Sequence, residues 1–332
     1  MSTEFKALVI EKSDDKIFSR HIKTRSVDDL PAGDVLVKVS YSSLNYKDAL
    51  SATGNPGVSR NFPHTPGIDA VGVVEASDSD AFNVGDEVIV TSYDLGMNTA
   101  GGLGQFIRVP AAWVLKKRVE LTNKEAMAYG TAGLTAALMV GALLDNGVTA
   151  DKGPVLVTGA TGGVGSVAVS ILSKLGFQVT AATGKASSTD FLKSIGAAEV
   201  IDRATLLDTS KPMYKEHWAG VVDVVAGDTL SHAIKSCQYN GVVTASGLVG
   251  AVDFTTSIYP FILRGVRLIG IDSVECSMAV RTKAWNNLAG AFKVDNIMSL
   301  VTEIRLEQVE TSLMNMLEGK SHGRIVVNMA DS

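Results

Sequence analysis

The pattern of apolar and polar positions changes about a third of the way along the chain. In the first part, β-branched runs at residues 7–10, 34–40, 70–76 and 87–91 are separated by Gly, Pro, Asn and Asp, as in short strands joined by turns. From residue 155 onward, apolar runs of strand length alternate with stretches of helical periodicity. The sequence therefore predicts an all-β segment followed by an α/β segment.

The α/β segment carries several strand-length apolar runs, and helical stretches separate most of them. The runs are residues 155–158, 178–182, 199–201, 221–225, 242–245 and 267–271. Strands that are joined through helices pair in parallel through right-handed crossovers. The pattern therefore predicts a doubly wound Rossmann sheet of six parallel strands.

Helical patterns also precede and follow this sheet. Residues 124–144 contain helix formers and no proline. Their apolar part, residues 130–144, is shorter than the roughly 20 residues of a membrane span, so we expect a buried helix. The chain ends in a helical stretch at 279–292 and a short helix and strand at 309–317 and 324–328. This tail is too short to fold alone, and we expect it to pack on the N-terminal segment.

Composition indicates a folded protein whose partners are small molecules. The 332 residues suit two domains, and 46% hydrophobic with 20% charged residues is typical of globular chains. The net charge of −5, with no basic run, disfavours nucleic acid as a partner. Two cysteines, Cys237 and Cys276, do not form a disulfide framework. With no targeting segment predicted at residues 1–10, we expect a cytoplasmic protein without a membrane partner.

A glycine-rich segment follows the strand predicted at residues 155–158. Its sequence is GATGGVG, at residues 159–165, and an amphipathic helical stretch follows and ends at Gly176. Such a turn lets backbone amides approach a pyrophosphate at a helix N-terminus. Gly162 and Gly165 match the second and third glycines of the dinucleotide fingerprint, whereas Ala160 occupies the first position. The context favours dinucleotide binding over a glycine-rich turn that binds nothing.

The end of the second predicted strand distinguishes the two nicotinamide coenzymes. NAD enzymes place an acidic side chain there, on the ribose 2′-hydroxyl. This chain has no carboxylate at 181–185 and carries Lys185, with Thr183, Ser187 or Ser188 as hydrogen-bond donors. Arg203 follows the third strand and supplies a second cation. These residues favour NADPH over NADH; the alternative is that Lys185 and Arg203 are ordinary surface charges.

The chain lacks the residues for metal or nucleophilic catalysis. Catalytic and structural zinc sites of alcohol dehydrogenases use several Cys and His ligands, whereas this chain has two cysteines and five scattered histidines. No G-x-S-x-G motif occurs. We therefore expect no metal site, and hydride transfer to an activated double bond is the chemistry that the sequence favours.

Several motifs along the chain resemble one known family. They are SLNYKDAL at 43–50, PGID at 66–69, GGL at 101–103, GTAG at 130–133, PFILR at 260–264 and GIDSV at 270–274. With the glycine-rich segment, they resemble the acrylyl-CoA reductase (NADPH) group of the medium-chain dehydrogenase/reductase superfamily. This group is also described as quinone oxidoreductases of the YhdH/YhfP type.

The resemblance implies a domain organisation and an oligomer. A GroES-like partial β-barrel would form the catalytic domain from residues 1–125 and 274–332, and a Rossmann NADPH-binding domain would span 126–273, with the active site between them. The strand predicted at 267–271 would lie at an open sheet edge, and such edges are normally covered. A two-fold homodimer that joins these edges would cover them and agrees with the resemblance.

The resemblance also implies which residues contact NADPH. They are Tyr46, Thr161, Gly162, Gly163, Val164, Thr183, Gly184, Lys185, Arg203, Leu248, Ile262, Ser273 and Arg324. One departure concerns the coenzyme phosphate, because members of the group carry Arg where this chain has Lys185. Lysine keeps the charge but loses the bidentate geometry, which predicts a weaker preference for NADPH.

The expected reaction is reduction of an α,β-unsaturated acyl-CoA, such as acrylyl-CoA to propionyl-CoA. Hydride reaches the β-carbon and the resulting enolate is protonated at the α-carbon, so the enzyme must orient two partners and stabilise negative charge. Candidates for a catalytic role are Tyr46, Asp48 and Tyr93, beside Lys47. Asp48 could equally cap a helix and Tyr93 could serve packing, and solvent can protonate an enolate.

Two further interpretations remain open from the sequence. The first is an NADPH-dependent reductase of quinones or small enones, without a site for CoA; Arg60 and Arg264 are candidate contacts for CoA phosphates, but no cationic cluster is diagnostic. The second is a non-catalytic protein that senses NADPH or binds RNA. The acidic balance disfavours an RNA-binding role.

Overall fold

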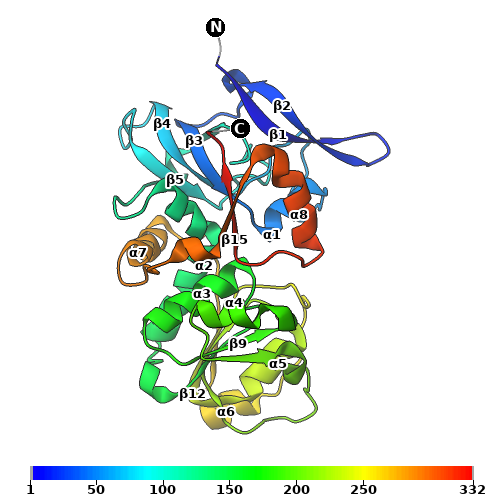
Figure 1. Cartoon of the computed structure of the whole chain (residues 1–332), viewed down its shortest axis with the longest axis vertical. Helices are drawn as coiled ribbons and strands as arrows, with labels where there is room; N and C mark the ends of the chain where they lie inside the picture. Colours follow the sequence, from blue (N-terminus) through cyan, green and yellow to red (C-terminus); the bar gives the residue numbers. More distant parts are fainter. Residues whose placement is uncertain (1–2, 331–332) are drawn as a thin grey trace. The chain divides into compact units, whose positions relative to one another are not determined.

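The computed structural model describes residues 3–330, and the chain forms two compact units. Unit 1 comprises Met1–Thr131, Val274–Ala289 and Leu300–Ser332, and unit 2 comprises Ala132–Ser273 and Gly290–Ser299. Figure 1 traces both units in sequence colours. The all-β and α/β segments predicted from the sequence correspond to the first part of unit 1 and to unit 2.

Unit 1 is built on a seven-stranded sheet and a separate hairpin. The sheet order is β14-β15-β3-β4-β5-β7, with β6 paired to β3, and the hairpin is β1-β2. The strands are β1 (Glu4–Lys12), β2 (Phe18–Ser26), β3 (Val35–Ser43), β4 (Asp69–Ser77), β5 (Glu87–Thr91), β6 (Phe106–Val109), β7 (Val114–Lys116), β14 (Val301–Arg305) and β15 (Arg324–Asn328). Alternate residues of β3, namely Val35, Val37 and Val39, are buried in one core.

The C-terminal tail joins this sheet. Strand β15, red in Figure 1, pairs antiparallel with the blue strand β3. Helix α8 packs on α1 in the same unit. The helices of unit 1 are α1 (Tyr46–Ala52), α7 (Met278–Ala289) and α8 (Val309–Leu317), with short 3-10 helices η1 (Val27–Asp29), η2 (Ala111–Trp113) and η7 (Leu306–Gln308).

Unit 2 is a doubly wound parallel sheet, as the sequence predicts. Its order is β10-β9-β8-β11-β12-β13, which is the 3-2-1-4-5-6 order of a Rossmann fold when the strands are numbered along the chain. The strands are β8 (Val155–Val157), β9 (Val179–Thr183), β10 (Glu199–Asp202), β11 (Trp218–Asp223), β12 (Cys237–Ala245) and β13 (Arg267–Gly270). The central strands β8, β9 and β11 are buried at every position, and the edge strand β13 is largely exposed.

Unit 2 also contains helices and short 3-10 helices, most of which lie between its strands. They are α3 (Gly163–Lys174), α4 (Thr189–Ser194), α5 (Gly227–Lys235) and α6 (Tyr259–Arg264), with η3 (Ala150–Lys152), η4 (Ala186–Ser188), η5 (Arg203–Leu206) and η6 (Ile297–Leu300). All six strands predicted for this part of the chain are confirmed, with end points that differ by a few residues.

Helix α2 (Asn123–Asp145) differs from the uninterrupted helix expected at 124–144. Gly130 has φ 51° and ψ −153°, which breaks the helix within its length. The helix is long and apolar enough to cross a membrane, but 72% of its most apolar window is buried in the protein, as in a core helix. A left-handed φ is strained for residues with a Cβ atom, so a glycine fits this position.

The limits of the two units differ from those expected from the sequence, 125/126 and 273/274, in two segments. Residues 126–131 belong to unit 1, where Ala128 and Thr131 bond to Arg324 and Asp69. Residues 290–299 belong to unit 2, where Asp295 pairs with Lys174 of α3 at 2.6 Å. Both assignments depend on tertiary contacts that local sequence patterns do not contain.

Candidate functional site

The glycine-rich turn of unit 2 joins β8 to the N-terminus of α3. Gly159 has φ 57°, and α3 follows the N-cap residue Gly162, whose position offers no side-chain cap. The first N–H groups of a helix have no acceptor within it, so those of α3 remain available to an anion. A Cβ atom on Gly165 would collide with the carbonyl oxygen of Gly159 and lie 2.8 Å from Cα of Ala160. Gly165 therefore allows the helix to pack closely on the turn.

Two cations and a hydroxyl lie at the carboxyl ends of β9 and β10. Thr183 ends β9 opposite Asp202 of β10, and its Oγ1 accepts a hydrogen bond from the backbone N–H of Lys185 at 3.0 Å. The Arg203 guanidinium lies 3.3 Å from the point where a side chain on Gly184 would begin. Partial burial lowers the pKa of Lys185 from its ordinary value.

The acidic side chain nearest in sequence to these cations points elsewhere. Asp202 caps η5, and its carboxylate accepts the backbone N–H of Ala204 at 2.9 Å. The segment Thr183 to Lys185 thus supplies a hydroxyl and a cation, and no carboxylate, at the end of the second strand. This donor set fits a phosphate on the adenosine ribose better than a free 2′-hydroxyl.

The other residues of unit 2 that are expected to contact the coenzyme differ in their position and burial. Thr161 and Val164 belong to the turn and its helix, with Gly162 and Gly163 between them. Ser273 is buried, and its Oγ accepts a hydrogen bond from Thr135 at 2.7 Å. Leu248 and Ile262 are exposed apolar side chains, the first after β12 and the second in α6.

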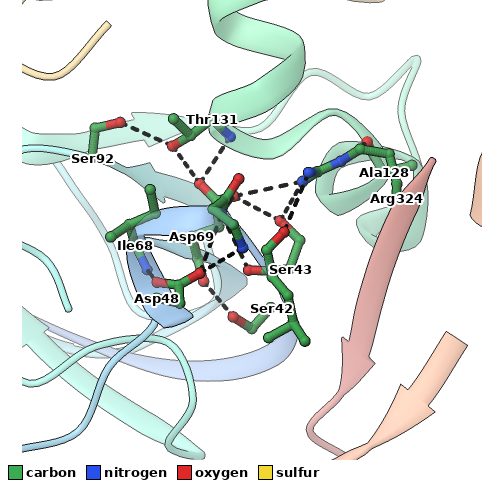
Figure 2. A network of polar contacts seen from close by, with 11 residues as sticks. Ser42, Ser43, Asp48, Ile68, Asp69, Ser92, Ala128, Thr131 and Arg324 are labelled. Atoms are coloured by element: carbon green, nitrogen blue, oxygen red, sulfur yellow. Dashed lines mark hydrogen bonds and ion pairs between the residues drawn. The ribbon is translucent and has the colours of Figure 1, made fainter. Parts of the chain in front are cut away.

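Asp69 is the centre of a buried polar network in unit 1 (Figure 2). This residue begins β4 and is fully buried. Its Oδ1 accepts the backbone N–H of Thr131 at 2.9 Å and the Thr131 hydroxyl at 2.6 Å. Its Oδ2 accepts the Ser43 hydroxyl at 2.6 Å and Nδ2 of Asn45 at 2.7 Å. These four hydrogen bonds replace most of the hydration that the Asp69 carboxylate loses on burial.

Arg324 supplies the positive charge of this network. The side chain is buried at the start of β15, with Nη2 2.9 Å from Oγ of Ser43 and 3.8 Å from Oδ2 of Asp69. Because the Ser43 hydroxyl hydrogen goes to Asp69, its oxygen accepts from Arg324. Two further bonds reach the carbonyl oxygens of Ala128 at 2.9 Å and Leu44 at 3.3 Å. The contact between Arg324 and NADPH, implied by the resemblance, stays a prediction.

The network extends to the loop after β5. Oγ of Ser92 lies 2.9 Å from Oγ1 of Thr131, and because Thr131 donates its hydrogen to Asp69, Ser92 is the donor. A Cβ atom on Gly130 would collide with Oδ2 of Asp69 and lie 2.5 Å from Oγ of Ser43. The glycine that breaks α2 therefore also makes room for the buried carboxylate.

Asp48 caps a helix in the structure. Capping and proton transfer were the two roles that the sequence allowed for this residue. It lies three residues after the N-cap Asn45 of α1, and its Oδ2 accepts the backbone N–H of Asn45 at 2.7 Å. Its Oδ1 accepts the backbone N–H of Ile68 at 2.9 Å. Tyr46 is the first residue of the same helix and is 40% exposed. The buried Asp48 therefore orients the helix turn that presents Tyr46.

Burial, and after it the charge of Asp69, raises the pKa of Asp48 to about 7, against the lowering effect of the bonds from Asn45 and Ile68. The unfolded value is about 4, so the folded state keeps this proton to higher pH. The contribution of Asp48 to stability is therefore full below about pH 4 and is lost as the pH rises to about 7.

We expect Asp48→Asn to remove this pH dependence. The unfolding free energy of the unchanged protein minus that of Asp48→Asn should fall by roughly 3 to 4 kcal/mol between pH 4 and pH 8. Urea unfolding across this range measures the difference, with the exposed Asp80→Asn as a control. A constant offset between the two proteins would instead mean that Asp48 is ionised throughout.

Tyr93 is packed within unit 1. Ser92 and Tyr93 have φ 62° and 50°, a left-handed pair without glycine. The Tyr93 ring stacks on Trp113 at 5.6 Å between centroids, and the guanidinium of Arg281 lies 4.3 Å from its centroid. Arg281 is buried and donates to the carbonyl oxygens of Thr91 at 3.0 Å and Val274 at 3.1 Å. These contacts support a packing role for Tyr93, whereas a catalytic role stays a prediction.

Several residues of the network were not foreseen from the sequence as site residues. They are Ser43, Asn45, Asp69 and Thr131. A charged residue within an apolar run was the available signal, since Asp69 lies between Ile68 and Ala70 and Arg324 precedes three apolar residues. The pairing itself could not be inferred, because the two charges are far apart in the chain.

The two arginines considered for CoA phosphates lie in different units. Arg60 is exposed, and its Nε donates to the carbonyl oxygen of Pro56 at 3.0 Å. Arg264 bonds through Nη2 to the carbonyl oxygen of Tyr214 at 2.7 Å and through Nη1 to that of Cys237 at 3.0 Å. The guanidinium of Arg264 therefore stabilises the backbone around it.

His, Cys, Asp and Glu are the side chains that could bind zinc. Within residues 3–330, no three His, Cys, Asp or Glu side chains gather as possible metal ligands. Cys237 is buried, and burial raises the pKa of its thiol to about 12, opposite to what a thiolate ligand requires.

Comparison with known families and proteins agrees with this architecture. Residues 31–119 match the alcohol dehydrogenase GroES-like domain, and residues 163–290 match the zinc-binding dehydrogenase family. YhfP of Bacillus subtilis, named as a quinone oxidoreductase, is 46% identical over 99% of this chain and 100% of its own. The acrylyl-CoA reductase AcuI of Ruegeria pomeroyi is 41% identical over 98% of this chain and 99% of its own.

Solved structures extend the likeness to three dimensions. The YhdH oxidoreductase of Salmonella enterica in complex with NADP has a TM-score of 0.95 and 40% identity, covering 97% of this chain and 99% of its own. YhfP of Bacillus subtilis with NAD bound has a TM-score of 0.96 and covers 98% of this chain and 100% of its own. The chain therefore belongs to the acrylyl-CoA reductase and YhdH/YhfP group of the medium-chain dehydrogenase/reductase superfamily.

Proposed function

We propose that this chain is a zinc-independent, NADPH-dependent reductase of activated C=C bonds, with acrylyl-CoA or a similar α,β-unsaturated acyl-CoA as its substrate. The observation that carries the proposal is the pair of cations, Lys185 and Arg203, at the ends of β9 and β10, together with the lack of a carboxylate among residues 181–185 at the end of β9. The substrate class is proposed from the relatives named as acrylyl-CoA reductases.

The residues of unit 2 would hold the coenzyme in two places. Amides at the N-terminus of α3 bind the diphosphate, and Gly165 keeps the helix close enough to do so. Lys185, Arg203 and the Thr183 hydroxyl bind the 2′-phosphate. When bound, NADPH supplies a hydride for the β-carbon of the substrate. Leu248, Ile262, Ser273 and Arg324 remain proposed contacts of the same coenzyme.

Tyr46 is the proposed catalytic residue, and Asp48 is a positioning residue. The hydroxyl of Tyr46 would donate a hydrogen bond to the thioester oxygen, where negative charge develops as the β-carbon accepts hydride. Protonation of the enolate at its α-carbon, by Tyr46 or by water, completes the reduction. Asp48 acts through its cap on α1 and does not touch the substrate. Tyr93 is proposed only as a wall of the substrate site.

NADPH oxidation in the presence of acrylyl-CoA, crotonyl-CoA and benzoquinone tests the proposal. We expect the highest kcat/KM with acrylyl-CoA, and a fall of about 10- to 100-fold in kcat for Tyr46→Phe. The half-exposed Tyr259→Phe in α6 is the control substitution. A clear preference for benzoquinone would replace the substrate proposal, and unchanged turnover in Tyr46→Phe would remove Tyr46 from the chemical step.

Reduction of quinones or small enones is the second candidate. It has the support of the relative named as a quinone oxidoreductase, at 46% identity. Coenzyme binding without turnover on any of the three substrates would instead favour a non-catalytic NADPH sensor. From the net charge of −5 and the small-molecule substrates in the names of the relatives, we infer a cytoplasmic enzyme without a nucleic-acid or membrane partner.

A homodimer through the β13 edge is also proposed. β13 ends the unit 2 sheet, and Leu268 on this strand and Leu263 before it are 36% and 55% exposed. An exposed apolar strand edge is a surface that proteins usually cover. We expect light scattering to give twice the mass of one chain, and Leu263→Asp/Leu268→Asp to give a monomer. Val119→Asp, at an exposed apolar side chain of unit 1, should stay dimeric; a monomeric unchanged protein would refute the dimer.

A further inference from the structure

The parallel sheet of unit 2 brings the carboxyl ends of its strands to one edge, and the residues discussed so far occupy only part of that edge. Lys185 and Arg203 follow β9 and β10, and the glycine-rich turn follows β8. Dinucleotides bind across such an edge at the point where the strand order reverses, which here lies between β8 and β11. With the adenosine half at β9 and β10 and the diphosphate beside β8, the nicotinamide half extends over the ends of β11 and β12.

A buried hydrogen-bonded pair joins β8 and β11 at this point. Asp223 is the last residue of β11 and Thr158 directly follows β8, and both are fully buried. The Thr158 hydroxyl donates to Oδ1 of Asp223 at 2.7 Å and accepts the backbone N–H of Val224 at 3.1 Å. Oδ2 of Asp223 accepts the backbone N–H of Ala226 at 2.8 Å. The carboxylate therefore fixes the residues that follow β11.

The turn that Asp223 holds has a strained backbone. Ala226 has φ 65° and ψ −159°, a region that glycine adopts readily and residues with a Cβ atom do not. Strained residues of this kind persist where the surrounding contacts fix them, and they cluster at ligand and active sites. The bond from Ala226 to Asp223 is such a contact, so the conformation of the turn depends on the buried carboxylate.

The turn after β11 also supports the loop after β12. The carbonyl oxygen of Val225 accepts the backbone N–H of Gly250 at 2.8 Å. A Cβ atom on Gly247 would collide with the carbonyl oxygen of Val224, so the glycine lets the two backbones approach. The loop at 247–250 carries Leu248, which is 61% exposed and is one of the proposed coenzyme contacts.

We propose that Asp223 is a positioning residue for the nicotinamide half of the coenzyme site. Because it is fully buried, it acts through the turn at 224–226 and, beyond it, through the loop at 247–250. Lys185 and Arg203 lie outside these contacts, so the adenosine half of the coenzyme should not respond to Asp223. This inference rests on the proposed binding of NADPH at the glycine-rich turn.

Calorimetric titration of Asp223→Ala with NADPH and with adenosine 2′,5′-bisphosphate tests the proposal. The second ligand carries the adenosine half and the 2′-phosphate but no nicotinamide. We expect the affinity for NADPH to fall about tenfold and that for adenosine 2′,5′-bisphosphate to change by less than about threefold. Asp223→Asn keeps an acceptor for the N–H of Ala226, so it should recover most of the NADPH affinity.

A milder variant and a control separate this role from a general loss of stability. Thr158→Val removes one bond to Asp223, so it should weaken NADPH binding selectively but less, and it decides the test where Asp223→Ala does not fold. The control is Thr244→Val in β12, which removes a buried hydroxyl that donates to the carbonyl oxygen of Val221 at 3.1 Å. It should lower the unfolding midpoint and leave both affinities unchanged.

Equal losses for the two ligands in the variants of Asp223 and Thr158, or no loss for NADPH, would overturn the positioning role and leave the proposed function in place. An unchanged protein that binds neither ligand would contradict the proposed function, and this inference with it.

Discussion

Replacement of both Lys185 and Arg203 with alanine is expected to lower the affinity for NADPH by about a hundredfold. Each cation forms a charge-assisted bond to the 2′-phosphate, and we assign about tenfold to each because both are partly open to solvent. NADH lacks this phosphate, so its affinity should change by less than about threefold. Fluorescence titration with the two coenzymes measures both constants.

The matched control for this pair is Lys152→Ala/Lys193→Ala, in the same unit. These lysines donate to the carbonyl oxygens of Gly147 at 2.6 Å and Ala198 at 2.7 Å, away from the coenzyme residues. Lys185→Arg should strengthen NADPH binding a few-fold, because a guanidinium binds phosphate through two bonds. Equal losses for NADPH and NADH in the double variant would mean that the two cations do not recognise the phosphate.

Arg324→Met is expected to lower the free energy of unfolding by about 3 to 5 kcal/mol. The substitution leaves the buried carboxylate of Asp69 without its cation and removes the donors to the carbonyl oxygens of Ala128 and Leu44. Guanidinium chloride unfolding, followed by circular dichroism, measures the change.

A double-mutant cycle separates the charge pair from the loss of packing. Because Asp69→Asn removes the unpaired charge, we expect Asp69→Asn/Arg324→Met to lose at least about 1 kcal/mol less than the sum of the single losses. Arg324→Lys keeps the positive charge but loses the planar set of guanidinium donors, so its loss of unfolding free energy should be intermediate. Additive losses, or a single loss below about 1 kcal/mol for Arg324→Met, would show that the pair contributes little.

The fold of unit 2 could be predicted because its signals are local. Strands such as β8 and β11 are buried on both faces and read as continuous apolar runs, and the helices between them dictate parallel crossovers. The glycine-rich turn is equally local, since strand, glycines and helix follow one another in one short segment. Its position between a strand and a helix was therefore predictable from the sequence.

Elements with little apolar patterning were missed. Strand β2 has no fully buried position and carries mainly polar residues, so its pairing with β1 depends on backbone bonds. The first half of β12 contains the exposed Tyr239 and Asn240, and only its buried second half was predicted. The break in α2 depends on the unusual backbone of Gly130, which a single glycine in a helical pattern does not reveal.

The polar network of unit 1 could not be predicted because it joins distant segments. Asp69, Thr131 and Arg324 come from β4, α2 and β15, and their contacts exist only after the tail pairs with β3. Tyr93 likewise depends on Arg281 from α7. Asp48 and Tyr93 were identified from the sequence as candidates for catalysis; in the structure Asp48 caps α1, and Tyr93 packs against Trp113 and Arg281.

Calorimetric titration of the pure protein with NADPH, and separately with NADH, tests whether the chain binds a coenzyme with a phosphorylated ribose. We expect NADPH to bind at one site per chain, with an affinity higher than that of NADH. NAD in the structure of YhfP makes the comparison of the two coenzymes informative. No heat with NADPH, or tighter binding of NADH than of NADPH, would contradict the claim that Lys185 and Arg203 hold a phosphorylated ribose beside the glycine-rich turn.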